Sequence, residues 1–156
     1  MTDDNDPGEI TLVLGGARSG KSHLGEAIIA REECAAVYVA TAQAHDGEMA
    51  ERIAAHRARR SDGGTTWLTQ EIPLELAPTL PALLATGEPV LIDCLTLWLS
   101  NIMLAERDVD SELEALATAL AGARGPLVLI SNETGLGIVP ENALARRFRD
   151  YSGIMN

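Results

Sequence analysis

The sequence predicts an α/β fold, a three-layer sandwich in which helices cover both faces of a mostly parallel central sheet. Short apolar runs alternate with helix-patterned stretches along the 156 residues, as in βαβ units. A glycine-rich turn joins the first apolar run to the first helical stretch. No linker interrupts the alternation, so we expect one domain over residues 10–156 after a flexible tail at 1–9.

The order of elements follows from hydrophobic periodicity. The expected strands are 10–14, 36–40, 66–70, 89–93 and 127–131, and the expected helices are 21–32, 46–60, 73–86, 94–105, 110–123 and 141–150. The first run, 10–14, is apolar and rich in β-branched residues, which predicts a strand buried on both faces. After the turn, apolar residues from Leu24 to Ile29 recur at helical spacing, which predicts the first helix.

The turn at residues 15–22 reads Gly-Gly-Ala-Arg-Ser-Gly-Lys-Ser, a complete G-x-x-x-x-G-K-[ST] motif, and its Lys21 is the only lysine of the chain. Successive N–H groups of such a turn, with the helix N-terminus behind them, bind phosphate oxygens. We expect Lys21 to reach the β- and γ-phosphates and Ser22 to hold Mg²⁺. The predicted fold is therefore P-loop NTPase-like, of the RecA-like kind, with a nucleoside triphosphate as ligand.

The composition of the chain argues against several classes of partner and location. A net charge of −11 argues against a nucleic-acid polymer, because such binding needs a basic surface that displaces counterions. No run approaches the roughly 20 apolar residues of a membrane span, and the acidic N-terminus is unlike a signal peptide. We therefore expect a cytoplasmic protein. Cys34 and Cys94 adjoin apolar residues and are expected to be buried free thiols.

Asp93 ends the apolar run Val90-Leu91-Ile92 and resembles the carboxylate of a Walker B strand. Ligands of an open α/β sheet gather at the carboxyl ends of its strands, so Asp93 is expected to face the Lys21 loop and to hold Mg²⁺ directly or through water. An aspartate in this position can also be a helix N-cap.

A basic helix stands out in this acidic chain, with Arg52, His56, Arg57, Arg59 and Arg60 inside nine residues. Asp46 could cap this helix, and the spacing of residues 49, 53, 56 and 60 places His56 on its inward face. Neighbouring arginines disfavour a protonated imidazole and can bind phosphates, which suits a nucleophilic histidine. The alternative is a solvated basic helix whose histidine has no chemical role.

Several segments together resemble one enzyme family. They are GGARSGKS at 15–22, YVATAQ at 38–43, EMAERIAAHRARR at 48–60, residues 67–71, VLIDCLTLWLSN at 90–101 and NETGLGIVPENALARRFRD at 132–150. The chain resembles, over nearly its whole length, the bifunctional adenosylcobinamide kinase/adenosylcobinamide-phosphate guanylyltransferase family of cobalamin biosynthesis. In that family a histidine at the position of His56 attacks the α-phosphate of GTP, and the GMP is then passed to the cobinamide phosphate.

The resemblance implies a set of site residues. His56 and Lys21 would be catalytic, and Ser22 and Asp93 would hold Mg²⁺, with GTP and ATP as substrates. The implied nucleotide contacts are Gly15, Gly16, Ala17, Arg18, Ser19, Gly20, Lys21, Ser22, Ala40, Thr41, Ala42, Arg57, Ala58, Arg59, Arg60, Glu71 and Asp93. Members often carry Glu where Asp93 stands. Residues 61–66 are slightly longer than the family pattern, which makes the placement of Glu71 less direct.

The resemblance also concerns the sheet and the assembly. A final apolar strand is expected beyond Asn156, so the C-terminal strand is apparently missing from this sequence. The resemblance further implies a homo-oligomer, a trimer whose neighbouring subunits help to form the site of the corrinoid substrate.

Three functions compete on the sequence. The first is kinase activity followed by guanylyl transfer through His56. The second is a simple P-loop small-molecule kinase with no covalent intermediate. The third is a regulatory GTP-binding protein, which is disfavoured because the only lysine already belongs to the P-loop and none is left for a guanine-recognition motif. His45 is a second candidate nucleophile, whereas His23 is expected to be a surface or packing residue.

Overall fold

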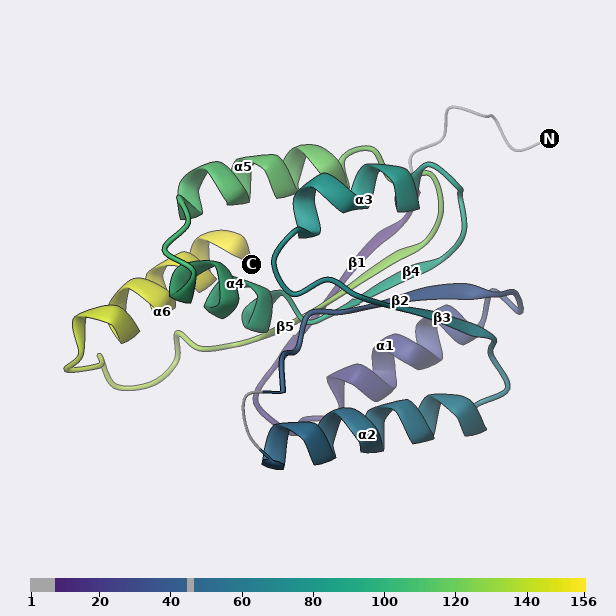
Figure 1. Cartoon of the computed structure of the whole chain (residues 1–156), viewed down its shortest axis with the longest axis horizontal. Helices are drawn as coiled ribbons and strands as arrows, with labels where there is room; N and C mark the ends of the chain where they lie inside the picture. Colours follow the sequence, from purple (N-terminus) through teal and green to yellow (C-terminus); the bar gives the residue numbers. More distant parts are fainter. Residues whose placement is uncertain (1–7, 45–46) are drawn as a thin grey trace.

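The computed structural model describes residues 8–44 and 47–156, and it forms three layers (Figure 1). In chain order the elements are β1 (Ile10–Gly15), α1 (Lys21–Ala30), β2 (Ala36–Ala40), α2 (Gly47–Asp62), β3 (Trp67–Glu71), α3 (Leu76–Leu84), β4 (Val90–Asp93), α4 (Leu95–Leu104), α5 (Val109–Leu120), β5 (Leu127–Asn132) and α6 (Ala143–Met155). Every predicted strand and helix is present within a few residues of its expected bounds. Asp46 and His45 lie outside the described residues.

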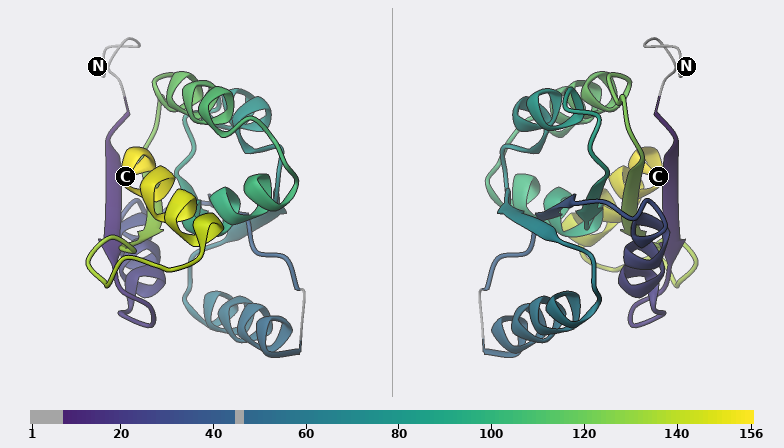
Figure 2. Two further views of the ribbon diagram at one scale, coloured as in Figure 1. Left: turned by 90° about the vertical axis from the view of Figure 1, so that its left-hand side faces the viewer. Right: turned by 90° about the vertical axis from the view of Figure 1, so that its right-hand side faces the viewer.

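The sheet has the order β1-β5-β4-β2-β3, and each neighbouring pair is parallel. Helices α3 to α6 lie on one face, and α1 and α2 lie on the other (Figures 1 and 2). The central strands β5, β4 and β2 are buried over almost their whole lengths, as expected of a parallel sheet covered on both faces. The predicted three-layer fold is confirmed.

The prediction that the first strand is buried on both faces is wrong. β1 is an outer strand of the described sheet and pairs with β5 alone. Val13 is buried, but Ile10, Leu12 and Leu14 are 46%, 38% and 44% exposed. An apolar run shows that a segment is a strand, but not how many neighbours that strand has, because burial of the second face depends on other segments.

The face of α1 that meets the sheet is centred on a glycine. Leu24 is 51% exposed, and the buried residues are Gly25, Glu26 and Ile29. Gly25 brings α1 close to the sheet, since a Cβ there would lie 3.0 Å from Ile130 Cδ1 and 3.2 Å from Leu91 Cδ1. The helix is therefore oriented by its smallest residue and not by its largest apolar one.

We expect Gly25→Val to lower the free energy of unfolding by about 1–3 kcal/mol, because the added methyl groups overpack this contact. Gly153→Val in α6 is the matched control, since a Cβ at Gly153 meets nothing within 4 Å. The control should shift stability by no more than about 0.5 kcal/mol. Urea unfolding of both variants is the measurement, and equal midpoints would show that the α1 contact is not tight.

Candidate active site

The predicted site residues gather at the carboxyl edge of the sheet. The parallel register pairs Gly15 with Asn132 and pairs Ala40 with both Asp93 and Glu71. The P-loop, the turn after β2, and the ends of β3 and β4 therefore lie along one edge, where ligands of open α/β sheets bind. β5 stands between the P-loop strand and the strand that carries Asp93.

The P-loop joins β1 to α1 through a tight turn. Gly20 has a φ of 86°, which a residue without a Cβ adopts at little cost, and α1 begins at the next residue. Lys21 Nζ donates to Gly16 O and to Ser19 Oγ, the latter at 3.3 Å, so the ammonium folds back over the loop. Ser22 is half-buried in the first turn of the helix. The loop thus has the strand-turn-helix context that its motif requires.

Thr41 fixes the turn after β2. Its Oγ1 donates to Cys94 O at 2.7 Å and accepts from Cys94 N at 2.8 Å, so one buried side chain bonds both polar groups of the residue after β4. Asn101 Nδ2, from α4, donates to Thr41 O at 2.8 Å and to Pro73 O at 2.9 Å. The turns that follow β2 and β3 are thereby held by the same amide.

Asp93 is half-buried and is not a helix cap. Cys94 is the N-cap of α4, and its Sγ accepts from Leu97 N at 3.5 Å. Asp93 Oδ2 instead accepts a hydrogen bond of 2.7 Å from Tyr38 Oη. Burial, and then the charge of Asp93, raises the pKa of Cys94 to about 11, so this thiol is neutral and a poor nucleophile at pH 7.

The two cysteines differ in exposure. Cys94 is buried, as predicted, but Cys34 is exposed, so the expectation of two buried thiols is wrong for Cys34. Cys34 lies in the loop between α1 and β2, where apolar sequence neighbours do not determine whether a side chain is covered.

Helix α2 carries the basic segment, and its inward face is as predicted. Among its described side chains, Met49, Ile53 and His56 are half-buried and Arg60 is buried, whereas the others are exposed. Figure 2 shows α2 standing beside the face of the sheet that α1 also covers. An exposed ion pair of 3.8 Å joins Arg18 of the P-loop to Glu48 of α2, an interaction of at most about 1 kcal/mol. The described side chains of α2 are therefore solvated on one side of the helix and covered on the other, where His56 lies.

Two arginines of α2 meet the sheet at different places. Arg57 forms an ion pair with Glu71 at the end of β3. Arg60 lies over the ring of Tyr38, with Cζ 3.5 Å from the ring centroid. A cavity of about 490 Å³ opens beside them, and Arg57, Arg60, Thr65, Trp67, Thr69 and Glu71 line it. The structure thus brings together three of the residues that the sequence assigned to nucleotide binding.

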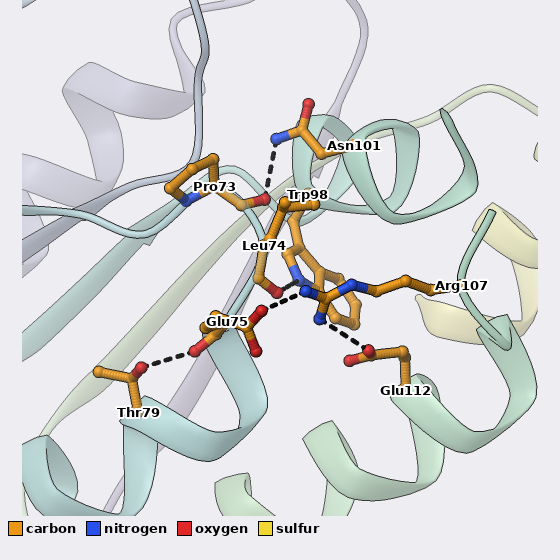
Figure 3. Close-up of polar contacts among 8 residues, drawn as sticks. All are labelled: Pro73, Leu74, Glu75, Thr79, Trp98, Asn101, Arg107 and Glu112. Carbon is orange, nitrogen blue, oxygen red and sulfur yellow. Dashed lines mark hydrogen bonds and ion pairs between the residues drawn. The ribbon is translucent and has the colours of Figure 1, made fainter. Parts of the chain in front are cut away.

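Helices α4 and α5 hold the segment that follows β3 (Figure 3). Trp98 Nε1 donates to Leu74 O at 3.0 Å, in addition to the bond from Asn101 to Pro73. Arg107 binds Glu75, and it also binds Glu112 at 3.1 Å. These contacts hold residues 73–75, which follow the end of β3 at Glu71.

The structure also places residues that the sequence left without a role in the site. His23 is exposed on α1, as expected of a residue without a site role. No group of three or more His, Cys, Asp and Glu side chains able to hold a metal occurs in the described part of the chain. Sequence reasoning missed the roles of Tyr38 and Asn101, although both stand in segments that carry the family resemblance. Their partners lie far along the chain, so no local pattern indicates these bonds.

No helix within residues 8–44 and 47–156 has the length and hydrophobicity needed to cross a membrane.

Comparison with known proteins identifies similar sequences. Residues 11–156 match the family described as cobinamide kinase / cobinamide phosphate guanyltransferase. The chain is 51% identical to the bifunctional adenosylcobalamin biosynthesis protein CobP of Pseudomonas aeruginosa over 144 residues, which are 91% of this chain and 82% of the relative. It is 39% identical to the bifunctional adenosylcobalamin biosynthesis protein CobU of Salmonella typhimurium over 160 residues. The Escherichia coli protein of that name is 37% identical over 160 residues, and both matches cover 93% of this chain and 86% of the relative.

Proposed function

Because the chain belongs to the cobinamide kinase / cobinamide phosphate guanyltransferase family, we propose that it carries out both reactions at one nucleotide site. It phosphorylates adenosylcobinamide with ATP or GTP. It then transfers GMP from GTP to adenosylcobinamide phosphate through a guanylylated His56, which gives adenosylcobinamide-GDP. The family match over residues 11–156 does not favour a simple kinase or a regulatory GTP-binding protein.

In the kinase step, the P-loop orients the triphosphate. N–H groups of the loop and the Lys21 ammonium bind the β- and γ-phosphates. The hydroxyl oxygen of the corrinoid attacks the γ-phosphorus and releases its proton to water. The bond from the γ-phosphorus to the bridging oxygen breaks, and a nucleoside diphosphate leaves. Mg²⁺ would neutralise the phosphate charge when bound. Ser22 and Asp93 fit this ion because both offer the oxygen ligands that it prefers, and both lie at the P-loop edge of the sheet.

In the guanylyl step, a ring nitrogen of His56 attacks the α-phosphorus of GTP. A P–N bond forms, the bond to the β-phosphate oxygen breaks, and pyrophosphate leaves. An oxygen of adenosylcobinamide phosphate then attacks the same phosphorus and releases the imidazole. Lys21 holds the β,γ end of the nucleotide, so the α-phosphate is presented to α2.

The remaining contacts are proposed from their places at this edge. The segments are Gly15–Ser22, Ala40–Ala42 and Arg57–Arg59, together with Glu71 and Asp93. Arg60 is not kept among these contacts, because it is buried and lies over the Tyr38 ring. The cavity beside Arg57 and Glu71 supports this assignment, because a carboxylate can accept guanine N–H groups and a guanidinium can bind phosphate. Since Arg57 and Glu71 form an ion pair, a nucleotide that uses both must share or separate that pair.

The proposal depends mainly on the position of His56. His56 is half-buried on the same face of α2 as Arg60, and this face is turned toward the sheet that also holds the P-loop. The test is incubation with GTP labelled at the α-phosphate, followed by denaturation. We expect a protein-bound label that acid removes and base does not, as for a phosphoramidate. An active protein that gives no such label would contradict the covalent route and favour direct transfer.

We also propose a homo-oligomer, the trimer that the family resemblance implies, and a cytoplasmic location. Large apolar side chains on the loop before α6 support self-association, because Leu136 and Ile138 are 91% and 97% exposed. Sedimentation velocity of the purified protein measures the assembly, and a monomer at micromolar concentration would contradict this part of the proposal.

A further inference from the structure

Tyr38 connects the basic helix to the carboxylate of β4. It lies in the middle of β2, is 3% exposed, and belongs to the same apolar cluster as Leu91 and Val128, on the face of the sheet that α1 covers. Its hydroxyl bonds Asp93 Oδ2 at 2.7 Å, and Arg60 of α2 lies over its ring at 3.5 Å. The Trp67 ring meets the Tyr38 ring edge-on at 5.8 Å and 88°. The ring is thus enclosed by two neighbours, with its hydroxyl on a third.

The hydroxyl of Tyr38 donates a hydrogen bond to Asp93. Between a phenol and a carboxylate, the phenol O–H is the donor and the carboxylate oxygen accepts. A donated hydrogen bond to a carboxylate is short and directional. This bond selects one orientation of the Asp93 carboxylate, in which Oδ2 is engaged by Tyr38 and Oδ1 is the oxygen offered to a ligand.

Arg60 has a different environment from a phosphate-binding arginine. It is 6% exposed, and its guanidinium lies against the ring face, the electron-rich part of the aromatic system. This contact seats the C-terminal half of α2 on the sheet one turn beyond His56. Tyr38 therefore contacts both Arg60 of the helix that carries His56 and the Asp93 carboxylate of β4.

We propose that Tyr38 is a positioning residue that orients Asp93 for Mg²⁺, and that Arg60 supports this through the Tyr38 ring and not through a phosphate. This rests on the proposed role of Asp93. Tyr38 touches neither nucleotide nor corrinoid in this assignment. It acts by removing the rotational freedom of a carboxylate that would otherwise have to be ordered when the metal binds.

The first test is Tyr38→Phe, which keeps the ring and removes only the hydroxyl. Binding of Mn²⁺ in the presence of GTP is measured from the free Mn²⁺ signal in electron paramagnetic resonance. We expect the affinity for Mn²⁺ to fall roughly tenfold, with GTP binding in the absence of metal changed by less than about twofold. Tyr151→Phe is the matched control, because Tyr151 bonds Asp110 of α5 at 3.3 Å, away from β4. Wild-type affinity for Mn²⁺ in Tyr38→Phe would overturn the proposal.

The second test separates the role of Arg60 from direct phosphate binding. Arg60→Met should weaken Mn²⁺ binding but leave metal-free GTP binding unchanged, and Arg60→Lys should restore most of the Mn²⁺ affinity because it keeps a cation. In a Tyr38→Phe background, Arg60→Met should add little further loss, since both act through one carboxylate. A fall in metal-free GTP affinity in Arg60→Met would make Arg60 a phosphate ligand and overturn its assignment.

Asp93→Asn separates the proposed metal role of Asp93 from the positioning role of Tyr38. If Asp93→Asn binds Mn²⁺ as tightly as the wild type, the proposed metal role of Asp93 is wrong, and the role of Tyr38 falls with it. If Asp93→Asn weakens Mn²⁺ binding and Tyr38→Phe does not, only the positioning role is wrong. Thermal unfolding of each variant identifies a loss that comes from the fold.

Discussion

Replacing His56 with alanine is expected to abolish the protein–GMP adduct and to lower guanylyl transfer by roughly 10³-fold or more, because the nucleophile itself is removed. Phosphorylation of adenosylcobinamide should continue within about threefold of the wild-type rate, since the P-loop does not need the imidazole for this step. Adduct formation is measured with α-labelled GTP, and the kinase step with γ-labelled GTP.

The matched control for this experiment is His23→Ala. His23 is exposed on α1 directly after the P-loop serine, so it tests whether any histidine near the nucleotide produces the effect. Undiminished label in His56→Ala would exclude His56 as the nucleophile and direct attention to His45. Loss of both activities with a lowered unfolding midpoint would mean that the half-buried His56 is needed for the structure.

Replacing Lys21 with alanine is expected to remove both activities, with the kinase rate lowered by roughly 10²–10³-fold, because the ammonium stabilises phosphate charge that grows in the transition state. The two variants should therefore behave differently. His56→Ala should lose guanylyl transfer and keep the kinase activity, whereas Lys21→Ala should lose both. Turnover of adenosylcobinamide and formation of the adduct are measured in parallel on the same preparation.

The composition provides an independent measurement for Lys21. Because it is the only lysine, an amine-acylating reagent can modify the side chain of Lys21 and, besides it, only the N-terminal amine. We expect GTP to protect Lys21 from acylation and to leave the N-terminus unprotected, as read by peptide mass spectrometry. Kinase activity that persists in Lys21→Ala, or equal acylation of Lys21 with and without GTP, would place the nucleotide elsewhere.

Much of the fold could be predicted because its signals are local. Apolar runs alternating with helical stretches indicate parallel strands with crossover helices, and the P-loop indicates the strand-turn-helix at Ile10–Ala30. The inward stripe of α2 was predicted from spacing alone and is confirmed at His56 and Arg60. The family resemblance was likewise carried by contiguous segments, and the family match confirms it.

The errors have a common cause. The exposed face of β1 and the exposed Cys34 each depend on what another segment covers. The orientation of α1 depends on a distant contact in the same way, because a Cβ at Gly25 would meet Ile130 and Leu91 of the sheet. Burial of a residue in an outer layer depends on distant segments, and a single sequence read locally does not contain that information.

By itself, the sequence determined the α/β class, the phosphate-binding loop with its lone lysine, the helical face that holds His56, and the family. These features depend on short-range patterns. Strands and helices have their own periodicities, and the tight turn of the loop requires glycine. The tertiary structure alone decided that Asp93 accepts from Tyr38 instead of capping α4, that Arg60 lies on the same ring, and that Asn101 holds two turns together. Each of these contacts joins residues more than 20 positions apart, so only the packing of the sheet brings the partners together.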